Sequence, residues 1–154
     1  MHKEFMARAI KLSIESVENG GGPFGAVIVK DGEIVAECAN SVTTDNDPTA
    51  HAEVNTIRQA CKTLNTYDLT GCVIYSSCEP CPMCLGAIYW AHLDELYFAN
   101  HKKDASDIGF DDAFIYEELD LPYAKRKLKT NQMMRDEAIQ AFQKWDEFEG
   151  KTEY

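Results

Sequence analysis

The order in which helical and extended patterns alternate along this chain constrains its fold more than any other feature. Apolar residues recur at helical spacing over residues 3–18, and a Gly-Gly-Gly-Pro run at 20–23 ends that pattern. Runs rich in β-branched residues follow at 24–30 and 33–37. The Asp-Gly pair between them, at 31–32, is typical of a tight hairpin.

The rest of the chain alternates in the same way. Residues 40–48 are polar and rich in turn formers, and they predict a loop. After it we expect, in order, a helix at 49–64, a buried strand at 72–76, a helix from 81 to about 91, a strand at 95–99 and a last helix at about 133–148. This order predicts an α/β fold in which helices cover both faces of one sheet.

Length, composition and charge limit the possible functions. A chain of 154 residues with 45% hydrophobic and 27% charged residues fits a single globular domain. No apolar run approaches the ~20 residues that cross a bilayer, and the N-terminal residues lack the pattern of a signal peptide, so we expect a cytoplasmic protein. The formal net charge of −11 disfavours nucleic acids and anionic membranes as partners, because both repel an acidic surface.

Two short segments predict a zinc site. A His-Ala-Glu sequence at 51–53 stands near the start of one predicted helix, and Pro-Cys-Pro-Met-Cys at 80–84 opens another. Cys81 and Cys84 are three residues apart, which places both thiols on one side of a helical turn. Zinc prefers nitrogen and sulfur ligands, so His51 and the two cysteines are its predicted ligands. Three protein ligands leave a fourth position for water, as in catalytic zinc sites.

Glu53 is the predicted proton carrier of this site. It lies two residues from His51, so it can stand beside the metal without ligating it. A carboxylate there can take a proton from the water, pass it to a ring nitrogen and then protonate a departing amine. The combination of His-x-Glu with Pro-Cys-x-x-Cys is the signature of zinc-dependent base deaminases.

The match to these deaminases extends well beyond the zinc segments. The matching stretches are 22–29, 47–54, 77–90, 109–112 and the terminal pair 153–154. On these residues the chain resembles the cytidine deaminase superfamily, and within it the bacterial guanine deaminases, over essentially its whole length. The Phe-Asp-Asp sequence at 110–112 and the terminal tyrosine favour the guanine branch.

The resemblance implies a fold, an assembly and a reaction. The implied fold is a single domain, residues 1–154, forming a three-layer α/β/α sandwich around a five-stranded mixed sheet. The implied assembly is a homodimer with one zinc ion per subunit, in which a C-terminal segment of about 125–154 is swapped between subunits and helps to close the partner's active site. The implied reaction is the hydrolysis of a small purine base, guanine, to xanthine and ammonia.

The resemblance also assigns roles to residues. His51, Cys81 and Cys84 hold zinc, and Glu53 moves protons. Five more residues are expected to bind the substrate: Asn40 at the polar edge of the ring, Phe24 and Trp90 at its faces, and Asp112 and Tyr154 at its polar groups. Each of these five residue types also has a purely structural use. Asn is common in turns, acidic pairs start helices, large aromatics fill cores, and chain ends fray.

Other functions stay open on the sequence alone. A tRNA adenosine deaminase shares both zinc segments, although the acidic charge argues against gripping RNA. A deaminase of cytosine, cytidine or a triazine would use the same chemistry on a different ring. Two readings are not deaminases: a zinc-binding regulatory module, which the missing fourth ligand disfavours, and a thiol redox protein, which the Cys-x-x-Cys spacing alone would permit.

Overall fold

The structure is a computed structural model that describes all of residues 1–154. The chain divides into two compact units, Met1–Ala113 and Phe114–Tyr154. The predicted single domain with a swapped C-terminal segment stays a prediction. No helix of the chain is both long enough and apolar enough to span a bilayer.

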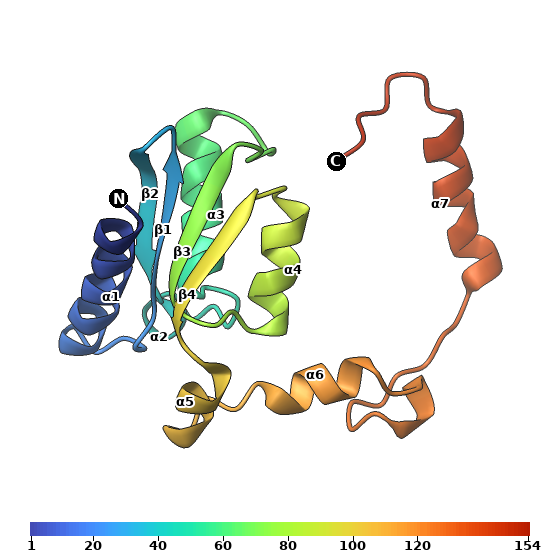
Figure 1. The fold of residues 1–154 in the computed structure, drawn as a ribbon. Helices are drawn as coiled ribbons and strands as arrows, with labels where there is room; N and C mark the ends of the chain where they lie inside the picture. Colours follow the sequence, from blue (N-terminus) through green and yellow to red (C-terminus); the bar gives the residue numbers. More distant parts are fainter. The chain divides into compact units, whose positions relative to one another are not determined.

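The first unit is built around a mixed sheet of four strands (Figure 1). These strands are β1 (Gly25–Lys30), β2 (Glu33–Ala39), β3 (Cys72–Cys78) and β4 (Glu95–Asn100), in the spatial order β2-β1-β3-β4. Strand β1 is antiparallel to both of its neighbours, whereas β3 and β4 are parallel. Asp31 and Gly32 take φ angles of 51° and 82° at the β1–β2 turn, which is the geometry that the predicted Asp-Gly hairpin requires.

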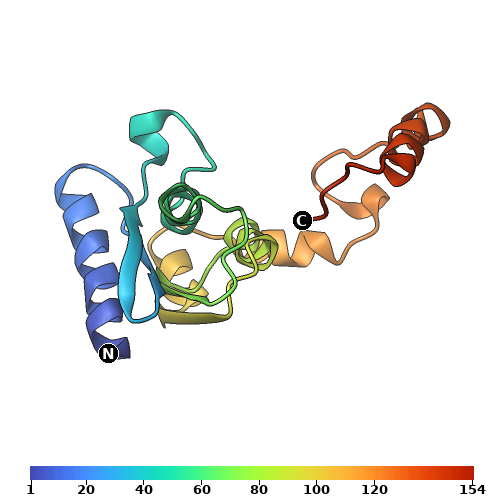
Figure 2. The same ribbon diagram turned by 90° about the horizontal axis from the view of Figure 1, so that it is seen from above.

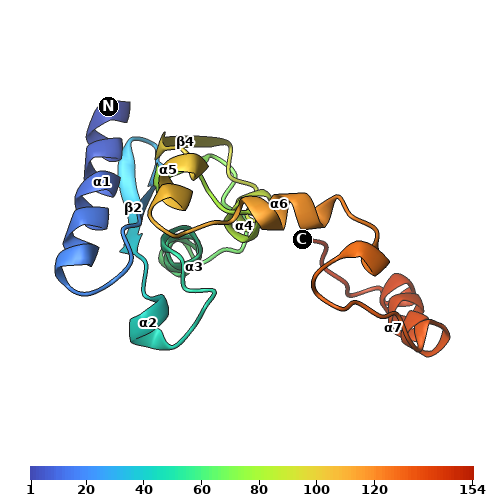
Figure 3. The ribbon, with the colours of Figure 1, turned by 90° about the horizontal axis from the view of Figure 1, so that it is seen from below.

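Helices cover both faces of this sheet (Figures 2 and 3). Helix α1 (His2–Glu18) lies on one face, and α3 (Ala52–Leu64) and α4 (Pro82–Trp90) lie on the other. Side chains along β1 alternate between the faces: Val27 and Val29 share a buried cluster with Ala9 of α1. Ile28 instead joins Ala60 of α3 in a second buried cluster. The predicted α/β sandwich is therefore confirmed, with each helical layer held by its own apolar core.

The sheet has four strands, so the expected fifth strand is wrong. After β4 the chain turns into helix α5 (Lys102–Asp107), where the predictions named no element. Local chemistry favours this helix: the His101 and Asp104 side chains form a reciprocal capping box at its start. Lys103 also pairs with Asp107 one turn later, at 2.8 Å. Only helices and loops follow, and they offer no strand to the edge of β4.

Two boundaries near the zinc segments differ from the predictions. Helix α3 begins at Ala52 and not at residue 49, because His51 is extended and stands at the N-cap position. The predicted loop at 40–48 contains a single helical turn, α2 (Val42–Asp45). The first difference places His51 in extended backbone just before the helix, and the second gives the neighbouring loop a short helical turn.

The second unit contains α6 (Ala113–Leu119, which begins at the last residue of the first unit), a short 3-10 helix η1 (Tyr123–Lys125) and α7 (Arg135–Glu147). The predicted last helix at about 133–148 is thus confirmed to within two residues at its start. Arg126 holds the middle of the unit together, since its Nε donates to the carbonyl oxygens of Glu118 and Leu121. None of the residues 114–154 is buried. This unit therefore has no apolar core of its own.

Candidate active site

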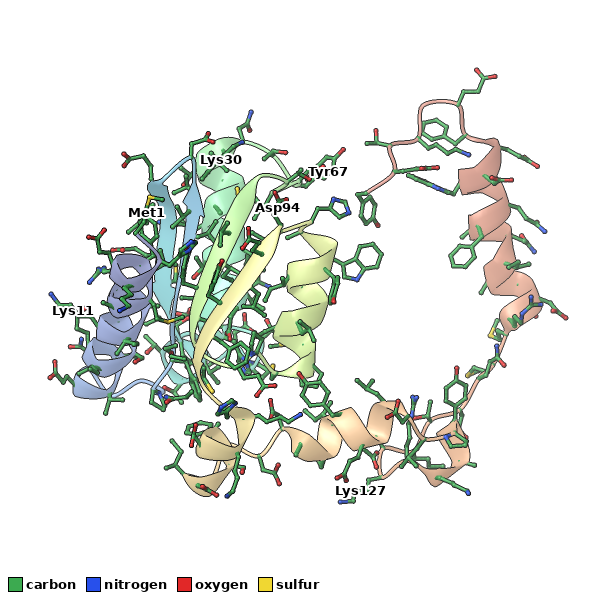
Figure 4. All side chains as sticks on the ribbon, viewed as in Figure 1. Met1, Lys11, Lys30, Tyr67, Asp94 and Lys127 are labelled. Carbon is green, nitrogen blue, oxygen red and sulfur yellow. The ribbon has the colours of Figure 1, made fainter.

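The candidate site lies at one end of the sheet of the first unit. Strand β1 starts there at Gly25, and β3 and β4 end there at Cys78 and Asn100, as their registers require. Helices α3 and α4 both begin at this end (Figure 1). Figure 4 shows Lys30 and Asp94 at the opposite end of the sheet. The convergence of strand ends and helix starts brings the two zinc segments together.

His51, Cys81 and Cys84 form a ready-made metal site. The Nδ1 atom of His51 lies 3.5 Å from Sγ of Cys81 and 3.4 Å from Sγ of Cys84. The three ligand atoms all lie within 4.8 Å of one another. In a tetrahedral zinc site with the usual bond lengths, a nitrogen and a sulfur ligand stand about 3.6 Å apart. The residues present therefore fit zinc in both donor type and spacing, as predicted.

The charges at this site also favour a metal. The Cys84 thiol and the His51 ring both face the sulfur of Cys81, and they lower the pKa of the Cys81 thiol well below its ordinary value. Cys81 in turn raises the pKa of His51. Both cysteines and the histidine stand within the first turn of a helix or at its cap, where the helix carries partial positive charge. This field stabilises thiolate, the form that binds zinc.

Glu53 lies beside the metal ligands in buried surroundings. Its side chain is on the first turn of α3 and is only 5% exposed, and it lines the cavity described below. Burial raises the pKa of this carboxyl group above its ordinary value. The Ser76 hydroxyl donates a hydrogen bond of 3.0 Å to Oε1 and orients the group. Glu53 is thus placed beside the metal ligands to accept and return a proton.

A cavity of about 580 Å³ opens beside this site, entirely within the first unit. Its wall includes His51, Glu53 and Cys81 together with three of the five predicted substrate contacts: Phe24, Asn40 and Asp112. The other two do not line it. Trp90 is the last residue of α4 and 68% exposed, and Tyr154 is the C-terminal residue of the second unit and 74% exposed.

Asn40 is held in a defined orientation at the cavity wall. Its Oδ1 accepts a hydrogen bond of 3.1 Å from the backbone N–H of Val42. This bond leaves the side-chain NH₂ as the group that Asn40 can offer to a ligand. Gly22 packs directly against it, because a Cβ atom there would lie 3.3 Å from both Cγ and Oδ1 of Asn40. Asn40 therefore both stabilises the turn and lines the cavity.

Asp112 contributes an unpaired carboxylate oxygen. Its Oδ1 is buried and has no hydrogen-bond partner, and burial raises the pKa of the group. The neighbouring Asp111 serves the helix instead, since its Oδ1 accepts the backbone N–H of Ala113 at 3.0 Å. The acidic pair thus divides between a capping residue and a residue in the cavity wall. A buried acceptor without a partner is costly, so a ligand with an N–H donor fits here.

Phe110 was not predicted as a site residue. It lines the cavity, and its ring meets that of Phe24 edge to face, with centroids 5.0 Å apart and an interplanar angle of 89°. Its only sequence signal is its position in the stretch 109–112, directly before the acidic pair. Gly109 makes the approach possible, because its φ of 98° turns the chain sharply before Phe110.

Comparisons with known proteins agree with this site. Residues 1–100 match the cytidine and deoxycytidylate deaminase zinc-binding region. The chain is 54% identical to the guanine deaminase of Bacillus subtilis over 154 residues, which is 99% of each protein. Its fold matches an X-ray structure of guanine deaminase from that organism with a TM-score of 0.97, over 100% of this chain and 99% of the other. It is 35% identical to a tRNA-specific adenosine deaminase of Aquifex aeolicus over 139 residues, 90% of this chain and 89% of that protein.

This chain therefore belongs to the cytidine and deoxycytidylate deaminase family. It is a zinc-dependent hydrolase whose metal site is formed by His51, Cys81 and Cys84, with Glu53 beside it. The readings as a thiol redox protein or a regulatory module do not account for this combination. Family membership and the metal site do not by themselves identify the ring on which it acts.

Proposed function

We propose that this protein hydrolyses guanine to xanthine and ammonia. The observation that carries the proposal is the buried, unpartnered Oδ1 of Asp112 in the wall of the cavity. Guanine as a free base carries ring N–H groups that a carboxylate can accept. The bases of adenosine and cytidine carry no ring N–H; their only N–H groups are those of the amine that leaves. The full-length similarity to a guanine deaminase supports the same choice.

The other residues of the cavity complement a flat, polar ring. Phe24 and Phe110 offer aromatic surface to the ring. The NH₂ group of Asn40 can donate to a ring carbonyl or nitrogen, because its Oδ1 is already used by Val42. Donor and acceptor thus stand on the cavity wall as fixed groups. Such sites reject analogues that leave a buried polar group unpaired, by roughly 10⁴-fold in strong cases.

Glu53 is the residue that we propose to move protons. When bound, zinc supplies a Lewis acid that lowers the pKa of a coordinated water to ~7. Glu53 would take one proton from the attacking water and deliver it to a ring nitrogen while the water oxygen bonds to C2. It would then pass the second water proton to the amine, so that the C2–N bond breaks, ammonia leaves and the oxygen stays on C2 as the carbonyl of xanthine. Its burial and its bond from Ser76 keep the carboxyl group aimed at these atoms during both transfers.

We also propose that the protein acts as a homodimer in which residues from about 125 to 154 serve the partner's site. The second unit exposes large apolar side chains that need a partner surface: Leu128, Met133, Phe142, Trp145 and Phe148. In such a dimer Tyr154 and Trp90 would reach a substrate that they do not contact through the cavity of one unit. Sedimentation velocity should give a dimer down to micromolar concentration, and a stable monomer would contradict this proposal.

A cytoplasmic location is part of the same proposal. All six cysteines are free, and two of them are metal ligands that must stay reduced. Reducing compartments keep thiols in this state.

The substrate proposal is tested by ammonia release. Zinc-loaded protein is offered guanine, adenine, cytosine, cytidine and an adenosine-bearing tRNA hairpin in parallel. We expect release from guanine to be the fastest, by at least about 100-fold over cytidine and the adenosine of the hairpin, because these nucleosides have no ring N–H to donate to Asp112. Asp112→Asn should remove most of this preference, whereas Asp107→Asn on the exposed end of α5 should not. Faster release from the hairpin would overturn the proposal in favour of RNA.

A further inference from the structure

Asn55 on α3 makes an unusual set of contacts close to the site. Its side-chain Nδ2 lies 2.9 Å from Oγ of Ser41, 3.1 Å from the carbonyl oxygen of Ala39 and 3.3 Å from that of Ala50. Two of these atoms are carbonyl oxygens, which can only accept, so the side chain must present its NH₂ group to them. Three acceptors thus share the two hydrogens of one amide.

These three acceptors flank the residues that perform the chemistry. Ala39 and Ser41 are the neighbours of Asn40 on either side, and Ala50 immediately precedes the zinc ligand His51. The backbone adds two bonds to the same junction: Ser41 N–H donates to Ala50 O at 3.0 Å, and Asn55 N–H donates to His51 O at 2.9 Å. One side chain therefore joins the substrate-facing loop to the start of the helix that carries His51 and Glu53.

The network continues into the cavity wall through Ser41. The Ser41 hydroxyl accepts from Asn55 and donates to Oδ2 of Asp45 at 2.6 Å. Asp45 is the last residue of α2, and Val42 and Thr43 of α2 line the cavity. The backbone of Val42 is also the donor that fixes the Asn40 side chain. Loss of the Asn55 amide would therefore loosen both Asn40 and this short helix.

We propose that Asn55 is a positioning residue for the deamination reaction. It holds the Asn40 amide at a set distance from His51 and Glu53, so that a ring bound by Asn40 is aligned with the proton carrier. This inference rests on the proposed function, because the aligned ring is the purine. Asn55 itself does not line the cavity and has no part in the chemical steps.

The proposal predicts a particular kinetic signature. A misplacement of about 1 Å can lower turnover about 100-fold without preventing binding. Asn55→Asp keeps the shape of the side chain but replaces the NH₂ donor with an acceptor that faces three oxygens. We expect kcat for guanine to fall about 100-fold with a smaller rise in KM, because Asn40 can still hold the ring, but out of alignment. A purely structural role would instead lower the yield of folded, zinc-loaded protein and leave kcat per bound zinc unchanged.

The experiment compares the parent protein, Asn55→Asp and the control Gln59→Glu. Gln59 is one helical turn further along α3 and exposed, so its variant adds the same charge to the same helix. Each protein is measured for zinc content, for kcat and KM on guanine, and for amide hydrogen exchange at Ser41 and Val42. The exchange measurement needs no substrate. In Asn55→Asp we expect faster exchange at both amides, by roughly fivefold or more, as for the loss of one hydrogen bond.

Each result decides between the possibilities. A lower kcat per zinc together with faster exchange, both absent in Gln59→Glu, supports the positioning role. Unchanged kcat and unchanged exchange in Asn55→Asp overturn it, as does a loss confined to zinc content. If the parent protein does not turn over guanine, the proposed function fails, and the exchange result still shows whether Asn55 holds the Asn40 loop.

Discussion

The two units of this chain solve the problem of apolar surface in opposite ways. In residues 1–113 a four-stranded sheet is covered on both faces, and side chains such as Ile28 and Ile74 are fully buried. In residues 114–154 no side chain is buried, and Phe142 is 73% exposed. The first unit is stabilised by its own apolar cores, whereas the second has no buried apolar side chains to stabilise it.

The two units also differ in which functional residues they contain. Every zinc ligand, the proton carrier and the whole cavity belong to the self-sufficient unit. The second unit carries exposed aromatic residues and the terminal tyrosine, which in the proposed dimer would contact the partner. Changes in the first unit should therefore alter turnover or stability directly, and on the proposed dimer changes in the second should act through assembly.

The largest effect is expected from Glu53→Gln. The amide cannot accept the proton that the reaction moves, so guanine turnover should fall by about 10²–10⁴-fold. Zinc content should stay at one ion per chain, since Glu53 is not one of the three ligands. Steady-state kinetics and metal analysis on the same preparation test both halves of this expectation. A fully active Glu53→Gln protein would refute the assigned role.

The next effect separates the two kinds of apolar surface. Ile74→Ala removes a completely buried side chain from the sheet and should lower the free energy of unfolding by about 2–5 kcal/mol. Phe142→Ala in α7 removes an exposed one, so it should change the stability of the isolated chain by less than about 0.5 kcal/mol. Denaturant unfolding at several protein concentrations is the measurement. An equally large, concentration-independent loss for Phe142→Ala would mean that the second unit is buried within its own chain.

Removal of residues 151–154 should act on turnover more than on the metal. Without Tyr154 the site loses roughly the value of one or two hydrogen bonds, or about tenfold in kcat/KM for guanine. Zinc content should be unchanged, because all three ligands lie in the first unit. Equal turnover in the truncated and parent proteins would show that the C-terminus takes no part in the site.

The smallest effect concerns the ion pair that joins α1 to β2. Arg8 donates two hydrogen bonds to the Glu37 carboxylate, at 2.8 and 2.6 Å, and lowers the pKa of Glu37. A folded-state pKa below the unfolded value of about 4.3 means that this stabilisation is complete above that pH and is lost as the pH falls through the folded pKa. Arg8→Met should cost at most about 1 kcal/mol at pH 7, since the pair is partly exposed.

Unfolding measurements from about pH 3 to about pH 7 test this expectation. The difference in free energy of unfolding between the parent and Arg8→Met should shrink at the acidic end. Lys103→Met, which removes a more exposed pair on α5, serves as the control and should have a smaller effect. A difference between parent and Arg8→Met that is constant with pH would contradict the assignment.

Much of the first unit could be predicted from sequence because its signals are local. The helical spacing at 3–18, the Asp-Gly hairpin and the buried run at 72–76 each fix one element, and all three are present. The zinc ligands could be predicted for the same reason, since donor type and spacing are written in two short segments. The capping box and the ion pair of α5 are weaker signals, and no element was predicted there; the five-stranded sheet was implied by the family resemblance and not by a pattern in these residues.

The parts of the site that could not be predicted depend on contacts between distant residues. Phe110 becomes a cavity residue only through its contact with Phe24, 86 positions earlier in the chain. Asn55 gave no signal, because a polar residue on an amphipathic helix is ordinary until its three acceptors are brought to it. The positions of Trp90 and Tyr154 outside the cavity could not be predicted either, because local patterns do not encode which side chains a cavity brings together.

Mixing two chains, one inactive and one weakened, tests most directly whether the C-terminal segment serves the partner's site. One carries Glu53→Gln with an intact C-terminus, and the other has an intact Glu53 but lacks residues 151–154. If the C-terminal segment serves the partner, mixed dimers contain one complete site and should recover about half of the parent's guanine turnover. If mixed dimers form, as native mass spectrometry can establish, and turnover does not rise above that of the truncated chain alone, the proposed division of labour between the units is contradicted.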